Sequence, residues 1–385
     1  MKILQVVTLF SPDAAYGGPL RVALNQSKAL QDSGHDVTIV AGSRGYEVLP
    51  THEHGVPVKL FRARNAIPKI GYAGMVAPAM LLWLRRSIQY YDIVHVHLAR
   101  DLVTLPVARL ALAYGIPTFV QTHGMIDTTD KLLAKPLDAF LTIPVLKKAR
   151  TVFYLTEHEQ TELKAVVGHS DVNLVELNNG TPEMDDRMFD QVSADHLPEV
   201  LYLARLQERK RPQVFVHAAK AVLDNGFRAR FSIVGPDEGE AKAVIALIDN
   251  SGHRDSIRYE GPLPFGESTE RYRQASIYVL PSVNEPYPMT VLEAMSAGLP
   301  VVVTDTCGVS PLIEKTQCGV VTDESTEALS SAISSLLEDP DKAALMGRRG
   351  RAAARDLLGM DSVRMLLETE YMNLGRPPAV ANELM

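Results

Sequence analysis

The chain has 385 residues, which is more than a single hydrophobic core usually holds and is suited to two domains. Its 46% hydrophobic and 22% charged residues are those of an ordinary globular protein. Acidic residues outnumber basic ones by 46 to 39, and the net charge of −7 argues against a nucleic-acid binder with a basic surface. The two cysteines, Cys307 and Cys318, exclude a disulfide scaffold, lack zinc-site spacing and are expected to be buried.

The N-terminus and the apolar runs bear on localisation. Gln5 interrupts the first apolar run and no cleavage site follows, so we expect no signal peptide. No apolar stretch reaches the ~18 residues that a membrane-spanning helix needs. We therefore predict a cytoplasmic protein.

Short β-rich runs alternate with helical patterns along the first half, which predicts a parallel sheet with crossover helices. Glycines such as Gly34, Gly115 and Gly168 follow the helices, where a left-handed residue ends a helix. The predicted strands are Lys2–Thr8, Asp36–Ala41, Val56–Phe61, Ile93–Val96, Thr118–Thr122, Thr151–Leu155 and Asn173–Glu176. The predicted helices are Leu20–Gln31, Ala77–Tyr90, Leu102–Ala113, Pro136–Lys148 and Glu157–Val166.

The periodicity stops at Asn178–Pro198, where we place a linker, and then begins again. The predicted strands of the second half are Glu199–Ala204, Ala229–Val234, Ile257–Tyr259, Ile277–Leu280, Pro300–Thr304 and Gly319–Thr322. Its predicted helices are Pro212–Asp224, Glu240–Ser251, Glu267–Gln274, Pro288–Ala297, Thr326–Glu338, Lys342–Leu357 and Asp361–Leu374. The fold class is therefore α/β, with two Rossmann-like doubly wound domains that meet across a cleft and bind ligands beyond the C-terminal strand ends.

The most informative segment joins the fourth predicted strand and the fourth helix of the second half. Pro288 is expected at the first helical position, which proline favours. Because helix N-termini attract anions, the amides of Met289 and Thr290 are expected to bind a phosphate. Glu285 suits sugar hydroxyls, and Glu293 suits a ribose diol. The alternative is that Glu285 merely starts the helix and Glu293 lies on the surface.

Two cations follow the first strand of the second half. Arg205 leaves the C-terminal end of that strand, and Lys210 stands at the start of the next helix. Cations fixed there can stabilise the charge of a leaving diphosphate. The alternative, solvated basic residues in a turn, suits Arg209 and Arg211 better than Arg205.

These motifs, in this order, resemble the bacterial retaining glycosyltransferases of family 4, which have the GT-B fold, over nearly the whole chain. The segments that carry the resemblance are Phe10–Asp13, Gly17–Pro19, Gly34–Val37, Asp92–His97, Gln121–Gly124, Asn179–Gly180, Val234–Pro236, Glu260–Pro262, Pro281–Ser282, and the pairs Arg205 with Lys210 and Glu285 with Glu293. The resemblance implies an acceptor-binding domain over residues 1–180, a linker over 181–198 and a nucleotide-sugar-binding domain over 199–360. It also implies that residues 361–385 form a helix that crosses back to the first domain, followed by a loose tail.

The resemblance assigns the donor contacts of the second domain. Arg205 and Lys210 would bind the diphosphate, and Glu293 would hold the ribose. Glu285, with the two helix amides, would grip the transferred sugar and its phosphate. Gly261, in the loop Tyr259–Leu263, would help to cradle the base.

Two further contacts are assigned to the first domain. His123 would face the donor sugar. Gly17 and Gly18 would let the backbone approach the substrates, since no Cβ intrudes.

One departure from the family pattern concerns the second domain, where Pro288 replaces the commoner glycine and removes one amide from the anion site.

No cluster of histidine, aspartate and glutamate residues has metal-ligand spacing. Asp185 and Asp186 lie in the linker and not in a metal-binding loop after a strand, so we expect no metal and no cofactor. His95 and His97 alternate along a predicted strand, and we expect only one of them to face the cleft.

Residues 1–180 carry 18 basic and 15 acidic side chains, against 21 and 31 in the remainder. The helix Ala77–Tyr90 combines Trp83 with Arg85 and Arg86, a pattern that suits an anionic membrane surface at the inner face. A core helix with a basic edge explains the same residues and is preferred from the sequence alone.

The predicted activity is the transfer of a sugar, with retention, from a UDP- or GDP-linked donor to a sugar or lipid-linked sugar acceptor in glycan, polysaccharide or glycolipid biosynthesis. The domains are expected to close around the donor. The alternatives are a nucleotide-sugar 2-epimerase of the same fold and an inactive nucleotide-sugar-binding subunit. Nucleotide release that requires an acceptor separates the first alternative, and donor hydrolysis excludes the second.

Overall fold

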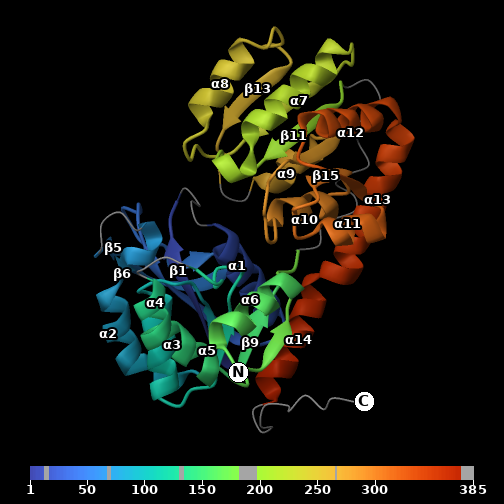
Figure 1. Ribbon diagram of the computed structural model, residues 1–385. Helices are drawn as coiled ribbons and strands as arrows, with labels where there is room; N and C mark the ends of the chain where they lie inside the picture. The colour runs from blue at the N-terminus through green and yellow to red at the C-terminus, as the bar shows by residue number, and fades with distance from the viewer. Residues whose placement is uncertain (13–16, 67–70, 130–133, 182–196, 265–266, 374–385) are drawn as a thin grey trace, which may run out of the picture. The chain divides into compact units, whose positions relative to one another are not determined.

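The computed structural model describes residues 1–12, 17–66, 71–129, 134–181, 197–264 and 267–373 (Figure 1). The chain divides into two compact units, Met1–Gly180 with Met360–Met385, and Thr181–Gly359. Most of the predicted linker and the predicted loose tail lie outside the described residues. Each unit is built on a parallel sheet with helices, which confirms the predicted α/β fold class.

The described part of the first unit contains a sheet of eight strands in the order β10-β9-β8-β7-β1-β2-β4-β3. Neighbouring strands are parallel except for β3 and β4. Successive strands add to opposite sides of the β1–β7 pair, so the topological switch point lies between β1 and β7. The strand bounds are β1 (Lys2–Phe10), β2 (Asp36–Ser43), β3 (His52–Glu53), β4 (Val56–Arg62), β7 (Ile93–His97), β8 (Thr118–Gln121), β9 (Thr151–Tyr154) and β10 (Leu174–Glu176). A separate two-stranded pairing joins β5 (Arg64–Asn65) to β6 (Met75–Val76).

Helices cover both faces of this sheet, which is why its strands are almost continuously apolar. On one face, α1 and α14 pack Leu30, Leu367 and the fully buried Tyr371 against Phe119 and Phe153. On the other face lie α2, α3, α5 and α6. The helix bounds are α1 (Gly17–Asp32), α2 (Pro78–Ser87), α3 (Thr104–Ala113), α4 (Ala134–Leu137), α5 (Ile143–Lys148), α6 (Glu157–Val167) and α14 (Met360–Met372), with 3-10 turns at Gly71–Gly74 and Ile88–Tyr90.

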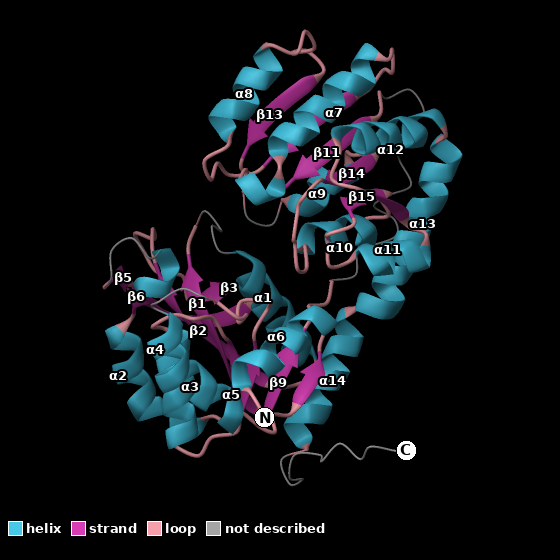
Figure 2. Ribbon diagram, viewed as in Figure 1, coloured by secondary structure: helices cyan, strands magenta, loops and turns pink. Residues whose placement is uncertain are grey.

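The second unit, within its described residues, has a six-stranded parallel sheet in the order β13-β12-β11-β14-β15-β16 (Figure 2). The chain reverses its direction of strand addition between β11 and β14, so these two strands flank the switch point of this unit. The strand bounds are β11 (Glu199–Leu203), β12 (Arg230–Val234), β13 (Ile257–Gly261), β14 (Ile277–Leu280), β15 (Val301–Thr304) and β16 (Gly319–Thr322).

The helices of the second unit pack in two groups, with α7 beside α8 and α12, and α10 beside α13. The two cysteines are buried among these elements, as predicted. The bounds are α7 (Pro212–Asp224), α8 (Ala241–Asp249), α9 (Ser268–Arg273), α10 (Met289–Ser296), α11 (Ser310–Thr316), α12 (Thr326–Glu338) and α13 (Pro340–Leu358), with a 3-10 turn at Glu208–Lys210.

Two local predictions are wrong, and one helix was missed. The helix predicted over Pro136–Lys148 is interrupted by a π-helical turn at Asp138–Thr142. Pro144 lacks the amide hydrogen that the carbonyl of residue 140 would accept, so a regular α-ladder cannot continue through it. Helix α11 was not predicted, because seven residues are too few to show helical periodicity. Pro288 precedes α10 as its N-cap instead of occupying the first helical position.

Candidate functional site

The predicted donor-binding residues of the second unit gather at its topological switch point. Arg205 lies two residues after β11, and Glu285 lies five residues after β14, and these strands are hydrogen-bonded neighbours. The turns that follow the two strands are joined, because the amide of Val283 donates to the carbonyl of Arg209 at 3.0 Å. The carboxyl ends of β11 and β14 therefore carry one continuous site, in the position that ligands occupy in doubly wound sheets.

Lys210 and Glu285 form a close ion pair, with 2.6 Å between Lys210 Nζ and Glu285 Oε2. Each side chain is only 9% exposed, and Arg209 Nη2 approaches the same oxygen at 3.5 Å. Burial lowers the pKa of Lys210, and the neighbouring carboxylate of Glu285 opposes that shift. Glu285 therefore does more than start a helix, since its carboxylate is half of a buried ion pair.

The backbone around Glu285 is fixed by a glycine that the sequence did not single out. Gly308 N donates to Glu285 O at 2.8 Å, and a Cβ at Gly308 would lie 1.9 Å from Pro286 O. Asn284 has a positive φ of 49°, a backbone conformation that asparagine tolerates better than most residues. The turn that carries Glu285 is thus held against the loop after β15, and any larger residue at position 308 would displace it.

Arg205 forms an ion pair with a different carboxylate, that of Glu238. Its Nη1 lies 2.9 Å and 3.2 Å from the two carboxylate oxygens of Glu238, which lies in the loop after β12. Arg205 is 36% exposed and Glu238 is 30% exposed. The two cations predicted to bind a diphosphate are therefore each paired with a different carboxylate.

The start of α10 carries the predicted anion-binding amides. The amide of Val291 donates to Pro288 O at 3.1 Å, so its hydrogen already has an acceptor within the helix. The amides of Met289 and Thr290 come before the helical ladder, as the first amides of a helix do. The hydroxyl of Tyr278 donates to Thr290 Oγ1 at 2.7 Å, which orients this first turn.

Glu293 is 5% exposed, which contradicts the alternative that it lies on the surface. The hydroxyl of Tyr272 lies 3.1 Å from Glu293 Oε2 and 3.1 Å from Thr290 O. Tyr272, itself fully buried on α9, was not singled out from the sequence. Its hydroxyl ties the carboxylate of Glu293 to the first turn of α10.

The predicted base loop is joined to the turn of Arg205 through glycines. Gly261 ends β13 with a φ of 83°, and its carbonyl accepts from Gly235 N at 2.9 Å. The hydroxyl of Tyr259 donates to Gly235 O at 3.0 Å. A Cβ at Gly235 would lie 1.9 Å from Ala204 O, so only glycine allows this close crossing of two loops.

In the first unit, His123 follows β8 and has a positive φ of 52°. Glu159, buried on α6, holds this turn by accepting from Thr122 Oγ1 at 2.6 Å and from Gly124 N at 2.5 Å. Glu159 was missed from the sequence, although Thr156 three residues earlier gives the spacing of a helix-capping pair. It fixes the backbone that presents His123.

His95, His97 and His123 form a column of imidazoles, with successive ring centroids 5.0 Å apart. The expectation that only one of His95 and His97 faces the cleft assumed that they alternate across the strand, but residues two apart in a strand lie on the same face, and the two rings are stacked. His97 Nδ1 lies 2.7 Å from His123 Nε2, and His97 Nε2 lies 2.9 Å from Gln5 Oε1. Burial lowers the pKa of His95 and of His123 to about 3, so the column is neutral near pH 7.

Gly17 and Gly18 form the first turn of α1, which follows β1 beside the switch point of the first unit. A Cβ at Gly18 would meet no atom of the described residues within 4 Å. Residues 13–16, which lead into this turn, lie outside the described residues.

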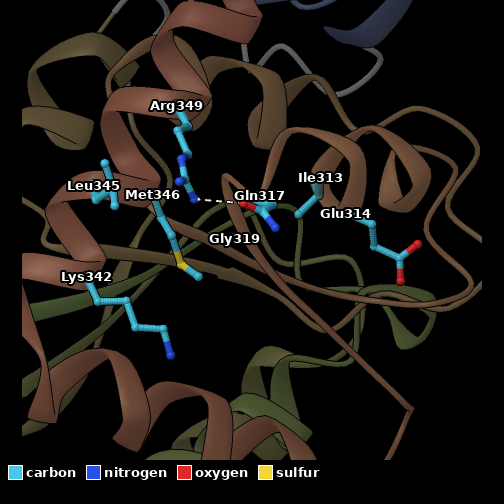
Figure 3. A pocket seen from close by; sticks show the side chains of 8 residues that line it. All are labelled: Ile313, Glu314, Gln317, Gly319, Lys342, Leu345, Met346 and Arg349. Carbon is cyan, nitrogen blue, oxygen red and sulfur yellow. Dashed lines mark hydrogen bonds between the residues drawn. The ribbon is translucent and has the colours of Figure 1, made fainter.

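A hollow of about 290 Å³ lies elsewhere in the second unit (Figure 3). Arg349 reaches across it and donates to Gln317 Oε1 at 3.1 Å. Gly319 is the first residue of β16, so the hollow lies at the amino ends of the parallel strands, whereas Arg205 and Glu285 follow carboxyl ends. It is lined by Ile313, Glu314, Gln317, Gly319, Lys342, Leu345, Met346 and Arg349. It therefore takes no part in the site at the carboxyl ends of the strands.

Comparisons with known proteins agree with this arrangement. A family model described as "Glycosyl transferase 4-like domain" matches residues 17–180, and one described as "Glycosyl transferases group 1" matches residues 184–353. A D-inositol 3-phosphate glycosyltransferase of Kribbella flavida is 24% identical over 386 residues, covering 90% of this chain and 89% of the relative. The enzyme of that name from Streptomyces avermitilis is 27% identical over 334 residues, covering 78% of this chain and 70% of its own.

Solved structures show the same fold. Anabaena Alr3699/HepE in complex with UDP has a TM-score of 0.75 and 17% sequence identity to this chain, covering 97% of this chain and all of its own length. The sucrose-phosphate synthase of Thermosynechococcus elongatus has a TM-score of 0.73, also at 17% identity, covering 97% of this chain and 99% of that chain. Because the two family models together account for most of the sequence, the chain belongs to the glycosyl transferases group 1 family and is a glycosyltransferase with two Rossmann-like domains of the GT-B type.

Proposed function

We propose that this glycosyltransferase moves a sugar, with retention of configuration, from a nucleoside-diphosphate sugar to a hydroxyl group of a sugar or lipid-linked sugar acceptor. The observation that carries the proposal is the buried pair of Lys210 and Glu285 at the switch point, in the turn that leads to the amides of Met289 and Thr290 at the start of α10. A cation and helix amides suit a diphosphate, and a carboxylate suits sugar hydroxyls. The site thus offers both kinds of group that such a donor requires.

In this proposal the bond between the anomeric carbon and the diphosphate breaks as the acceptor oxygen bonds to the same face of that carbon. The acceptor proton passes to the departing phosphate oxygen, so no side chain serves as a nucleophile. Arg205, Lys210 and the first amides of α10 stabilise the negative charge that grows on the diphosphate. Each of these groups is held by the fold before the substrate binds.

The remaining candidates orient the substrates. Glu285 binds hydroxyls of the transferred sugar, Glu293 binds the ribose, and the backbone at Gly261 borders the base. In the first unit, His123 and the turn at Gly17 contact substrates. The strained backbone of His123, held by buried hydrogen bonds, supports a positioning role.

The donor is proposed to be a UDP- or GDP-linked sugar, and UDP-sugars are the first choice because Anabaena Alr3699/HepE was solved with UDP and with UDP-glucose. The proposal needs no metal ion, because side-chain cations and helix amides are proposed to stabilise the charge of the diphosphate. Among the described residues, no group of three acidic, histidine or cysteine side chains is arranged to hold a metal ion.

We expect sugar transfer to continue in the presence of EDTA. The assay incubates the protein with UDP- and GDP-sugars and with glycan acceptors, and measures nucleotide release and product with and without the chelator. Nucleotide release that requires an acceptor supports a transferase and distinguishes it from a 2-epimerase. Loss of turnover in EDTA that Mg²⁺ or Mn²⁺ restores would contradict the metal-free proposal.

We also propose that the outer side of α2 contacts an anionic membrane. Met80 and Leu84 of this helix are buried in the unit, whereas Leu82 is 62% exposed and Arg85 and Arg86 are exposed. One apolar and two basic exposed side chains suit the headgroup region of an anionic bilayer. Within the part of the chain that the structure describes, no helix is long and apolar enough to span a membrane.

Replacing Arg85 and Arg86 by glutamate is expected to abolish binding to anionic vesicles, and salt is expected to weaken binding of the wild type. The measurement is co-sedimentation with vesicles of phosphatidylglycerol and phosphatidylcholine. The matched control reverses two exposed charges on other helices of the same unit, Arg109→Glu and Lys164→Glu. Equal binding of the two double variants, or no binding of the wild type, would leave α2 with the role of a core helix with a basic edge.

A further inference from the structure

We propose that Glu238 occupies the diphosphate-binding face of Arg205 before the donor arrives, and that its displacement sets the affinity for nucleoside diphosphates. This inference rests on the proposed function and assigns a role to a residue outside the predicted site. Glu238 contacts Arg205 Nη1 through both carboxylate oxygens, at 2.9 Å and 3.2 Å. A carboxylate and a phosphate present similar paired oxygens to a guanidinium group. Glu238 therefore occupies Nη1 of Arg205, a donor that a diphosphate oxygen would otherwise contact.

The pairing follows from the backbone of the two loops. Strands β11 and β12 are parallel neighbours, and their loops stay paired beyond the strand ends, with Leu206 N donating to Pro236 O at 2.9 Å. Glu238 N in turn donates to Leu206 O at 3.0 Å. The loop that carries Glu238 is thus fixed beside the turn that carries Arg205.

The two other acidic residues of this loop have different partners. Asp237 Oδ1 accepts from Gly239 N at 2.8 Å and from Ala241 N at 3.0 Å, and these bonds support the start of α8. Glu240 accepts from Gln213 Nε2 at 2.6 Å. Of these three carboxylates, Glu238 is the one that contacts Arg205.

The exposure of the pair allows it to open. With 36% of Arg205 and 30% of Glu238 exposed, water solvates both groups when they part, and such pairs are weak. The pair of Lys210 and Glu285 differs, because both of its members are 9% exposed and Glu285 is proposed to remain at the sugar. A diphosphate carries more charge than one carboxylate and can displace Glu238 from Arg205, but part of its binding energy is then used to break the existing pair.

The experiment measures binding of UDP and of GDP by calorimetry to the wild type, Glu238→Gln, Arg205→Ala and the double variant. Glu238→Gln is expected to bind the nucleotide about two- to fivefold more tightly, which corresponds to the worth of an exposed ion pair. Glu208→Gln is the matched control, because it removes an equal charge from the exposed turn next to Arg205, where Glu208 forms no ion pair with a described residue. It is expected to change the affinity less than Glu238→Gln does.

The double variant tests whether the effect passes through Arg205. In the Arg205→Ala background, Glu238→Gln is expected to give no gain in affinity. Wild-type binding with an unchanged or weaker affinity of Glu238→Gln would overturn the inference and leave the proposed function standing. A gain that persists without Arg205, or that Glu208→Gln reproduces in full, would also overturn it. Failure of the wild type to bind either nucleotide would overturn the proposed function together with the inference.

Discussion

Replacing Glu285 by glutamine is expected to lower kcat for sugar transfer by about a hundredfold or more without weakening the binding of the nucleoside diphosphate. The carboxylate is proposed to bind the transferred sugar, which the bare nucleotide lacks. Its loss also leaves Lys210 without its close anionic partner, so the attraction of Lys210 for a diphosphate does not fall. Calorimetry with the nucleotide, beside transfer rates at saturating donor, separates the two effects.

Arg205→Ala provides the contrast to Glu285→Gln. Arg205 is proposed to face a diphosphate that is charged in the ground state and more so as the glycosidic bond breaks. Its loss should weaken nucleotide binding and also lower kcat, with about 2–4 kcal/mol added to the barrier. If Glu285→Gln loses nucleotide affinity as severely as Arg205→Ala, or keeps full activity, the assignment of Glu285 to the sugar is wrong.

Arg271→Met is expected to lower the free energy of unfolding by about 3–5 kcal/mol, because it leaves a buried carboxylate without its cation. Arg271 Nη1 lies 3.0 Å from Glu199 Oε2, and Nη2 lies 2.8 Å from Glu199 Oε1. The guanidinium also lies 3.2 Å from Glu260, next to Gly261. The side chains of Arg271 and Glu199 are 7% and 8% exposed, so water cannot replace the lost partner. Urea denaturation followed by circular dichroism measures the change.

The control for this substitution lies on the same short helix. Arg273→Met removes an ion pair with Glu270, whose side chains are 32% and 57% exposed, and is expected to cost about 1 kcal/mol or less. Adding Glu199→Gln to Arg271→Met removes the stranded charge and should restore part of the lost stability. Equal destabilisation by Arg271→Met and Arg273→Met would show that the buried pair contributes nothing special.

The sequence predicted most of the strands and helices because each leaves a local pattern. The apolar runs at Ile277–Leu280 and Gly319–Thr322 match the observed strands residue for residue, and their turn residues mark both ends. The site residues that follow such strands could be found for the same reason, since a parallel sheet brings carboxyl ends to one edge. The sequence alone therefore predicts that Arg205 and Glu285 lie at the carboxyl ends of neighbouring strands.

The partners of these residues could not be found in that way. Glu238 lies 33 positions from Arg205, and Gly308 lies 23 positions from Glu285, so no local spacing connects them. Their roles depend on which strands are neighbours and on how two loops cross. The error over His95 and His97 has a different origin, because the period of two along a strand does predict that both side chains share a face.

The first unit is built from two segments that lie far apart in the sequence, and this affects the order in which the two units can fold. Its core includes Tyr371 of α14, whose hydroxyl lies 2.5 Å from His95 Nδ1, while residues 181–359 form the other unit. During synthesis, α14 becomes available only when nearly the whole polypeptide has left the ribosome. Until then, the face of the sheet that binds α14 lacks this helix. The second unit is continuous in sequence and can complete its core earlier. A nascent chain that stops before Met360 would therefore present the apolar side chains of Leu30, Phe119 and Phe153 to the folding machinery of the cell.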